Sequence, residues 1–342
     1  MSLPQPSLPD RGFFLGCLLA GFALLPGRSA AGVQVDAAAG EEAIHAAVAA
    51  LPPGGGVVEL GSGTFLVTRP IILDRDGVEL RGQGPGTRLQ LAARANCPVV
   101  LIGSIHTPVE RVVRRITVRQ LTIDGNRTEQ DYECYGGPCD ERNLTALRNN
   151  GITIRGAADI LVEDVLTRRA RSGGVVLEKD CSRVRLNRLE SADNEFDGVA
   201  AYESEDCEFT HLNLHHNRSA GFSFDWRFVR NRIADCVASD NGSQGIFMRD
   251  SRWNTFERVT LQRNGEQGVF IAETTELPGT ACRRNRFIQV VITGNRAQGL
   301  RINDRSCESN QLVDSLVRDN RLEDISLAVP GLLEIQRPQP GQ

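Results

Sequence analysis

One eight-residue pattern occurs in three successive versions: Asn217-Arg-Ser-Ala-Gly221-Phe-Ser-Phe, Asn241-Gly-Ser-Gln-Gly245-Ile-Phe-Met and Asn264-Gly-Glu-Gln-Gly268-Val-Phe-Ile. The glycine of this pattern recurs along the chain at intervals of 23, 24, 23, 24, 23 and 31 residues. The full column is Gly151, Gly174, Gly198, Gly221, Gly245, Gly268 and Gly299. A fixed period of this size indicates that each repeat is one supersecondary unit, which stacks on its neighbours.

The residues after each glycine alternate in the manner of a β-strand. The first and third are apolar, as in Ile152/Ile154 and Phe222/Phe224, and alternation of this kind has the period of a strand. A second apolar run lies midway through the repeat, for example at residues 256–261. Two or three short strands per turn, with no helical segment between them, predict an all-β fold, a parallel β-helix of about ten coils.

The two ends of the chain differ from the repeats. An apolar stretch at residues 12–25 is shorter than the roughly 20 residues that span a bilayer, and small residues follow it at 29–31. We therefore predict a signal peptide at residues 1–31, and hence a periplasmic or extracellular protein that is not held in a membrane. A capping segment with a helix at 40–51 is predicted within residues 32–56, followed by the β-helix at 57–329 and a flexible tail at 330–342.

Charge and cysteine content narrow the choice of partners. The formal net charge is −4 and no basic stripe is present, which argues against a nucleic acid as the partner. We expect a polysaccharide as the partner and a monomeric protein. Cys134 and Cys139 are the best local candidates for a disulfide, and Cys181 and Cys207 could also meet across adjacent coils. The cysteine spacings do not predict a metal site.

The outward-facing positions of the regular strands carry the candidate site. The fourth residues after the glycines are Arg155, Glu178, Tyr202, Asp225, Arg249, Ala272 and Asn303. The fifth are Gly156, Lys179, Glu203, Trp226, Asp250, Glu273 and Asp304. A flat sheet with such side chains can hold an extended sugar polymer, because aromatic faces stack on rings and charges meet uronates. For any one residue, a merely solvated outer face explains the same pattern.

Five of these residues form the predicted catalytic group: Glu178, Lys179, Tyr202, Asp225 and Arg249. Lys179 is the only lysine in the chain, and a partly buried lysine can lose its proton and act as a base. A strong preference of this sequence for arginine, with one lysine left by chance, explains Lys179 equally well. The predicted substrate-binding residues are Arg155, Trp226, Arg227, Asp250, Tyr132 and Tyr135. The last two lie in a long polar insertion at 124–150, and a second insertion occupies 272–285.

Two further motifs carry a family resemblance, Gly54-Gly-Gly-Val-Val-Glu-Leu60 and Arg119-Gln-Leu-Thr-Ile-Asp-Gly-Asn-Arg127. Together with the N-x-x-x-G coils, they make the mature chain resemble the pectin-lyase-like right-handed β-helix superfamily. The likeness is nearest to the modules of mannuronan C5-epimerases and alginate lyases. In that family a Tyr-Gly-Phe-Asp-Pro-His signature holds the catalytic Tyr, Asp and His, whereas Gly173, Val176 and Glu178 stand here. This departure argues against that family's own epimerase mechanism.

The resemblance also implies a second chemical scheme. In other β-helix lyases a lysine or arginine acts as the base, while Ca²⁺ or an arginine neutralises the uronate. Lys179, Arg227 and Arg249 could serve such a scheme in this chain, with Ca²⁺ as an optional cofactor.

Three functions remain open on the sequence. The first is a polysaccharide lyase or epimerase acting on a uronate polymer. The second is a glycoside hydrolase with paired carboxylates. Glu178 and Asp225 lie two rungs apart, at roughly 9.6 Å, near the inverting separation, and Asp225 and Asp250 lie one rung apart, nearer the retaining one. The third is a non-catalytic glycan-binding β-helix of the cell envelope.

Overall fold

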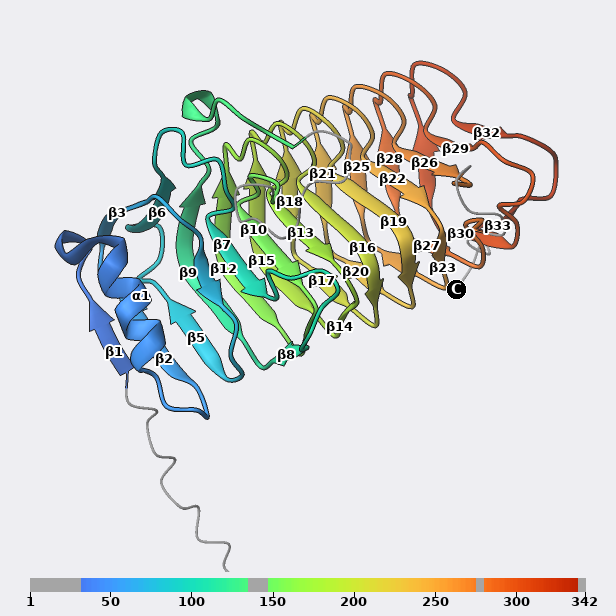
Figure 1. Ribbon diagram of the computed structural model, residues 1–342. Helices are drawn as coiled ribbons and strands as arrows, with labels where there is room; N and C mark the ends of the chain where they lie inside the picture. The colour runs from blue at the N-terminus through green and yellow to red at the C-terminus, as the bar shows by residue number, and fades with distance from the viewer. Residues whose placement is uncertain (1–31, 135–146, 275–279, 338–342) are drawn as a thin grey trace, which may run out of the picture. The chain divides into compact units, whose positions relative to one another are not determined.

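The computed structural model describes residues 32–134, 147–274 and 280–337, which form a β-solenoid of about 12 turns (Figure 1). Strands from successive turns pair in parallel, so the predicted fold class is confirmed. The solenoid has more turns than the glycine column predicts, because rungs also come from β1 (Gly32–Val35) and β33 (Leu333–Gln336). Neither of these strands follows a glycine of the column.

The strands that open the repeats form the first face of the solenoid. In chain order they are β4 (Ile71–Leu73), β7 (Val100–Gly103), β10 (Ile152–Arg155), β13 (Val175–Glu178), β16 (Val199–Glu205), β19 (Phe222–Val229), β22 (Ile246–Arg249), β26 (Val269–Ala272), β29 (Leu300–Ile302) and β32 (Ile325–Leu327). Four short strands join the same sheet: β8 (Val113–Arg114), β11 (Ala157–Ala158), β14 (Cys181–Ser182) and β23 (Ser251–Arg252).

The other two faces belong to one 19-stranded sheet. The second face consists of β1, β2 (Gly56–Leu60), β5 (Val78–Arg81), the first halves of β9 (Thr117–Asp124), β12 (Leu161–Arg168) and β15 (Arg185–Ala192), then β17 (Glu208–Thr210), β20 (Arg232–Ala234), β24 (Thr255–Glu257), β27 (Arg286–Ile288), β30 (Asn310–Val313) and β33. The third consists of β3 (Gly63–Val67), β6 (Thr87–Leu91), the second halves of β9, β12 and β15, then β18 (Asn213–His215), β21 (Val237–Ser239), β25 (Thr260–Gln262), β28 (Val291–Thr293) and β31 (Leu316–Arg318).

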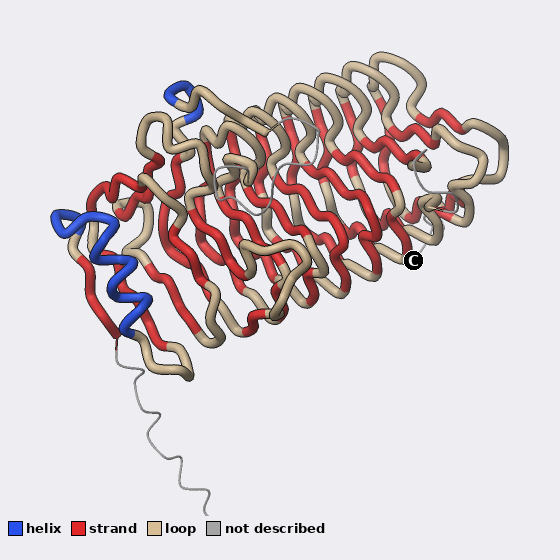
Figure 2. The backbone as a smooth tube through the Cα atoms, in the orientation of Figure 1, coloured by secondary structure: helices blue, strands red, loops and turns tan. Residues whose placement is uncertain are grey.

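A short helix covers the N-terminal end of the solenoid, as predicted. Helix α1 spans Gly40–Ala50 and directly follows a 3-10 turn, η1 (Ala37–Ala39). Another 3-10 turn, η2, spans Arg127–Glu129 in the first insertion. Helix α1 lies against the first rungs (Figures 1 and 2), and its Ile44 and Val48 are buried in the core. No helix in the described parts of the chain is long and apolar enough to cross a membrane, and the predicted signal peptide lies outside them.

The glycine column exists because the first face passes very close to the third. A Cβ built on Gly221 would lie 2.6 Å from Ala238 Cβ and 2.9 Å from the carbonyl oxygen of Gly245 on the next rung. Any side chain there would push two turns apart. The apolar residues that follow each glycine are buried, as Phe222 and Phe224 show with exposed fractions of 0%.

Two ladders of asparagine amides run along the solenoid inside its turns. The first links the asparagines of the N-x-x-x-G pattern and its equivalents, each Nδ2 donating to the Oδ1 of the next: Asn194, Asn217, Asn241, Asn264, Asn295 and Asn320. The sequence analysis missed a second one, formed by Asn231, Asn254, Asn285 and Asn310. The asparagines of the first ladder do not have a positive φ. The preceding residue does, for example His216 or Asp240, so these amides serve hydrogen bonding rather than the left-handed turn.

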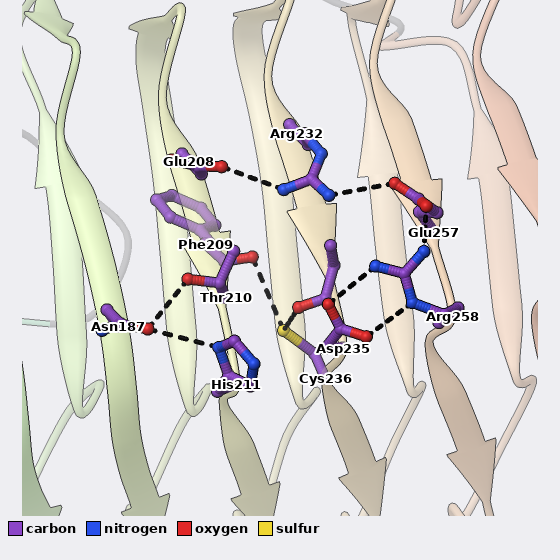
Figure 3. Close-up of polar contacts among 11 residues, drawn as sticks. Asn187, Glu208, Phe209, Thr210, His211, Arg232, Asp235, Cys236, Glu257 and Arg258 are labelled. Carbon is purple, nitrogen blue, oxygen red and sulfur yellow. Dashed lines mark hydrogen bonds and ion pairs between the residues drawn. The ribbon is translucent and has the colours of Figure 1, made fainter.

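Exposed ion pairs line the outside of the second face. Arg232 bridges Glu208 and Glu257 of neighbouring rungs at 2.9 and 3.0 Å, and Arg258 binds Asp235 (Figure 3). Similar Arg–Asp pairs recur at the corners, where both partners often have a positive φ, as Asp240 and Arg263 do. Charged outward rows are thus common in this solenoid, so charge alone does not identify a functional site.

Candidate functional site

The fourth-position column forms a row of polar side chains across the outside of the first face. Register pairs Arg155 with Glu178 and Tyr202 with Asp225, and Arg249 contacts Asp225 from the following rung. The row therefore reads cation, anion, phenol, anion, cation. Four of the five predicted catalytic residues lie in this row, and Lys179 follows directly after one of them.

The first ion pair of the row joins a fully buried guanidinium, Arg155, to a partly buried carboxylate, Glu178. Arg155 has an exposed fraction of 0%, and its Nε lies 3.0 Å from Glu178 Oε1. The Arg155 Nη2 also donates to Thr107 Oγ1 at 2.7 Å. Thr107 belongs to the loop after β7, so this loop covers the row at Arg155. A merely solvated outer face is therefore the wrong description at Arg155.

The second ion pair joins a buried carboxylate to a half-exposed guanidinium. Asp225 is 3% exposed and accepts the Trp226 backbone N–H at 2.8 Å through Oδ1. Its Oδ2 accepts Arg249 Nε at 2.9 Å and Nη2 as well. The Arg249 side chain is 36% exposed, and Asp225 does not engage its Nη1. This guanidinium is thus held in place while part of it faces solvent.

Tyr202 lies between the two ion pairs and contacts Ser223 through a side-chain hydrogen bond. Burial raises the pKa of the Tyr202 phenol, and the negative charge of Asp197 raises it further. Asp197 itself is buried, which raises its pKa, while side-chain hydrogen bonds with Ser219 and Ser223 and the Ala220 backbone N–H at 2.9 Å oppose that shift. The phenol thus keeps its proton at neutral pH, and Ser223 connects it to a carboxylate.

The predicted substrate-binding residues after these strands are less closely grouped. Trp226 is 46% exposed, and Arg227 forms an ion pair with Asp180. Asp250 is buried, and its Oδ2 accepts the Arg227 backbone N–H at 2.9 Å. Burial raises the pKa of Asp250, against the opposing charge of Arg252. Lys179 is half-buried and adopts a left-handed φ of 61°.

Tyr132, the predicted tyrosine of the first insertion that the structure describes, is not among the side chains of this row. Tyr132 is 54% exposed, and Tyr135 lies outside the described residues, as does Cys139. Cys134 is disulfide-bonded. The neighbouring Glu133, which sequence reasoning passed over, is buried and accepts the backbone N–H of Asn149 at 3.2 Å. Burial raises the pKa of its carboxyl to about 7.

Sequence reasoning also missed an aromatic stack on the same face. Phe247 and Phe270 are the second residues after their glycines, an outward position, and lie on adjacent rungs with ring centroids 5.7 Å apart and planes at 15°. The Arg249 guanidinium lies 5.3 Å from the Phe247 centroid, and that of Arg301 lies 5.9 Å from the Phe270 centroid. The two rings therefore hold a guanidinium at either end of the stack. Their outward position in the repeat was a usable signal, but the stack itself depends on the register.

A hollow of about 270 Å³ continues the row toward the N-terminus. It lies beside Gly103, which pairs with Arg155 in register, and is lined by Ile72, Asp74, His106 and Arg111 among others. Among the described residues there is no cluster of three or more His, Cys, Asp or Glu that could hold a metal ion. A Ca²⁺ ion coordinated partly by the carboxylate of a bound uronate would need fewer protein ligands. A requirement for Ca²⁺ is therefore tested in the presence of the substrate.

Comparison with protein families decides the classification. A family model described as the right-handed beta helix region matches residues 113–280 and 173–328. The chain belongs to this right-handed β-helix family. No curated protein matches the sequence.

Several solved structures share the fold of this β-helix. The A-module of the Azotobacter vinelandii mannuronan C-5 epimerase AlgE4 has a TM-score of 0.66 at 23% identity, over 85% of this chain and 76% of that one. The periplasmic alginate epimerase AlgG gives 0.54 at 14% identity, over 89% and 82%. The catalytic domain of a GH87 alpha-1,3-glucanase gives 0.50 at 10% identity, over 83% and 64%. At these identities the likeness establishes the fold, which epimerases and a glucanase share.

Proposed function

We propose that this β-helix is an exported, monomeric enzyme that removes the C5 proton of a uronate in a polysaccharide, as a lyase or an epimerase. The observation that carries the proposal is the row in which a half-buried phenol, Tyr202, lies between two carboxylate–guanidinium pairs. A purely structural row would not need a phenol that holds its proton beside a half-exposed arginine. The fold shared with alginate epimerases supports the substrate class.

The proposed chemistry begins with the substrate carboxylate. Arg249 binds it through the N–H groups that Asp225 leaves accessible, and this neutralisation acidifies the C5 proton. Asp225 fixes the guanidinium in place, as does the Phe247 ring. We therefore assign Asp225 a positioning role in place of direct proton transfer.

Proton transfer then divides between two residues. Because burial keeps Tyr202 protonated, we assign it the role of the acid, and Lys179 that of the base. In a lyase the base takes the C5 proton, the electron pair forms the C4–C5 double bond, and the C4–O bond breaks. The departing oxygen takes the Tyr202 proton, which can be restored through Ser223 and Asp197. In an epimerase no bond to the chain breaks, and a proton returns to C5 from the opposite face.

The proposal is tested by incubating the mature protein with alginate, polygalacturonate and a neutral glycan, with and without Ca²⁺. Unsaturated uronate, seen by ultraviolet absorbance, identifies a lyase, and a change in C5 configuration, seen by NMR, identifies an epimerase. Tyr202→Phe removes the acid, and Tyr132→Phe is the matched control because Tyr132 is exposed. No absorbance and no configurational change on either uronate polymer would refute the proposal.

One observation favours a second candidate function, glycoside hydrolysis. Asp250 is buried with a raised pKa one rung from Asp225, so it could hold the proton of a general acid. Glu178 and Asp225 are both ion-paired with arginines, whereas the acid of a hydrolase must be protonated. New reducing ends without ultraviolet absorbance would favour Asp250 and Asp225. Binding without any turnover would leave the glycan-binding alternative.

A further inference from the structure

Cys282 and Cys307 occupy the same position on consecutive turns of the solenoid. Each lies three residues before an asparagine of the second ladder, and these asparagines, Asn285 and Asn310, are bonded at 3.0 Å. Arg286 pairs with Gln311 in register at the same offset of 25 residues. Rungs of a parallel sheet are roughly 4.8 Å apart, so the two cysteine Cα atoms are at about that spacing. Disulfides join Cα atoms about 4.4–6.8 Å apart.

The surroundings of the two cysteines fix them together. Both have an exposed fraction of 0%. Asn310 Nδ2 donates to the carbonyl oxygens of both Cys282 and Cys307, each at 3.1 Å, so one amide holds both backbones. The two thiols also contact each other through a side-chain hydrogen bond.

Cys181 and Cys207, the other pair predicted across adjacent coils, do not lie at equivalent positions of their turns. Cys181 pairs in register with Ser204 and not with Cys207, so the predicted meeting of those two does not follow the rungs, and both are free thiols. Cys282 and Cys307 are free thiols in the structure as well. The chain nevertheless contains a disulfide at Cys134, which indicates an environment that allows thiol oxidation.

We propose that Cys282 and Cys307 form a disulfide that joins consecutive turns at the end of the second insertion. This inference does not depend on the proposed enzymatic function. The cross-link would close a ring of the 25-residue repeat and hold the turn that follows β26 against the next one. It would stabilise the C-terminal turns against unfolding, because the closed ring lowers the conformational entropy of the unfolded chain.

The oxidation is a thiol–disulfide exchange with a small disulfide such as oxidised glutathione. The Cys307 thiolate attacks the oxidant, and one glutathione thiolate leaves. Cys282 loses its proton to solvent and attacks the Cys307 sulfur, releasing the second glutathione. The two cysteines are oxidised, the glutathione disulfide is reduced, and two protons leave the protein thiols. Since both thiols are buried, the exchange takes place before the last turns close.

The test uses the full chain, refolded once with oxidised and reduced glutathione and once with excess reductant. Remaining thiols are alkylated, and the protein is digested without reduction and analysed by mass spectrometry. We expect a peptide in which Cys282 is linked to Cys307 in the first sample only. Cys236→Ser, at another single buried thiol, should leave this link unchanged. Alkylated Cys282 and Cys307 in the folded, glutathione-treated protein, or links from them to other cysteines, would overturn the proposal.

Thermal unfolding gives a second, independent readout. The linked protein should have a Tm higher by roughly 5–10 °C than the reduced one. Reduction also opens the disulfide at Cys134, so Cys282→Ser is compared under both conditions, and most of the difference should disappear in it. An equal difference in Cys282→Ser would contradict the proposal. Should Cys282→Ser fail to fold, the peptide analysis of the unaltered chain decides the question alone.

Discussion

Replacing Asn241 by alanine tests how much the first asparagine ladder stabilises the solenoid. The Asn241 amide makes four hydrogen bonds. Its Nδ2 donates to Asn264 Oδ1 at 3.0 Å and to the Leu214 carbonyl oxygen at 3.1 Å. Its Oδ1 accepts the Nδ2 of Asn217 at 2.9 Å and the backbone N–H of Asn217 at 3.2 Å. Asn241 is 2% exposed, so water does not replace these bonds.

The expected loss follows from the groups left without a partner. Asn241→Ala leaves the Asn217 backbone N–H buried without its acceptor, at about 1–3 kcal/mol, and removes the amide's bonds to the Leu214 carbonyl oxygen and to Asn264 Oδ1, at about 0.5–1.5 kcal/mol each. The Asn217 amide keeps its bond to the Ser191 carbonyl oxygen and therefore loses less. We expect the free energy of unfolding to fall by about 4 kcal/mol.

Asn320→Ala is the matched control, because Asn320 ends the ladder and is half-exposed. Water can take over its bonds, so we expect a loss of about 1 kcal/mol. Urea unfolding of both variants, followed by circular dichroism, gives the two midpoints. A loss below about 1 kcal/mol for Asn241→Ala, or equal losses for the two variants, would refute the reasoning.

Three further predictions address the corners, the first insertion and the site. Arg263→Ala removes an exposed ion pair with Asp240, so unfolding by urea should show a loss of only about 0.5–1 kcal/mol; a loss as large as that of Asn241→Ala would contradict this view of the corners. Burial raises the pKa of Glu133 from 4.5 to about 7, so the folded state binds its proton more tightly than the unfolded state does. The free energy of unfolding should therefore fall as the pH rises from about 4.5 to about 7. Stability measured over this range should fall less in Glu133→Gln, and an unchanged pH profile would count against the burial effect. Tyr202→Phe should lower turnover on a uronate polymer by about 100-fold or more at unchanged Tm. Tyr132→Phe should leave turnover unchanged, because Tyr132 is exposed. Equal effects of the two substitutions on initial rates would show that Tyr202 is not part of the mechanism.

The parts of the fold that the sequence predicted depend on contacts between equivalent positions of adjacent turns. Gly221 recurs because a side chain would strike the next rung, and the apolar residues after it fill the core. Such constraints repeat in every turn, so they appear in the sequence as a period. The second asparagine ladder follows the same rule and could have been found, but the insertion between Asn254 and Asn285 hides its spacing.

The details of the site were harder to predict because they arise between segments far apart in the chain. Arg155 is buried beneath Thr107, which lies 48 residues earlier in an irregular loop. The row itself was visible, since its members follow the glycine column. Which carboxylate each arginine binds, and that Tyr202 contacts Ser223, depends on side-chain directions that the period does not encode.

The measurement that most directly tests the central claim follows alginate and polygalacturonate incubated with the mature protein and with its Tyr202→Phe variant. Ultraviolet absorbance and the NMR signals of C5 epimers are recorded in parallel. The proposed function predicts unsaturated uronate or inverted C5 centres with the unaltered protein, and a loss of about 100-fold or more in the variant. Turnover that the Tyr202 substitution leaves unchanged, or reducing ends as the only product, would contradict it.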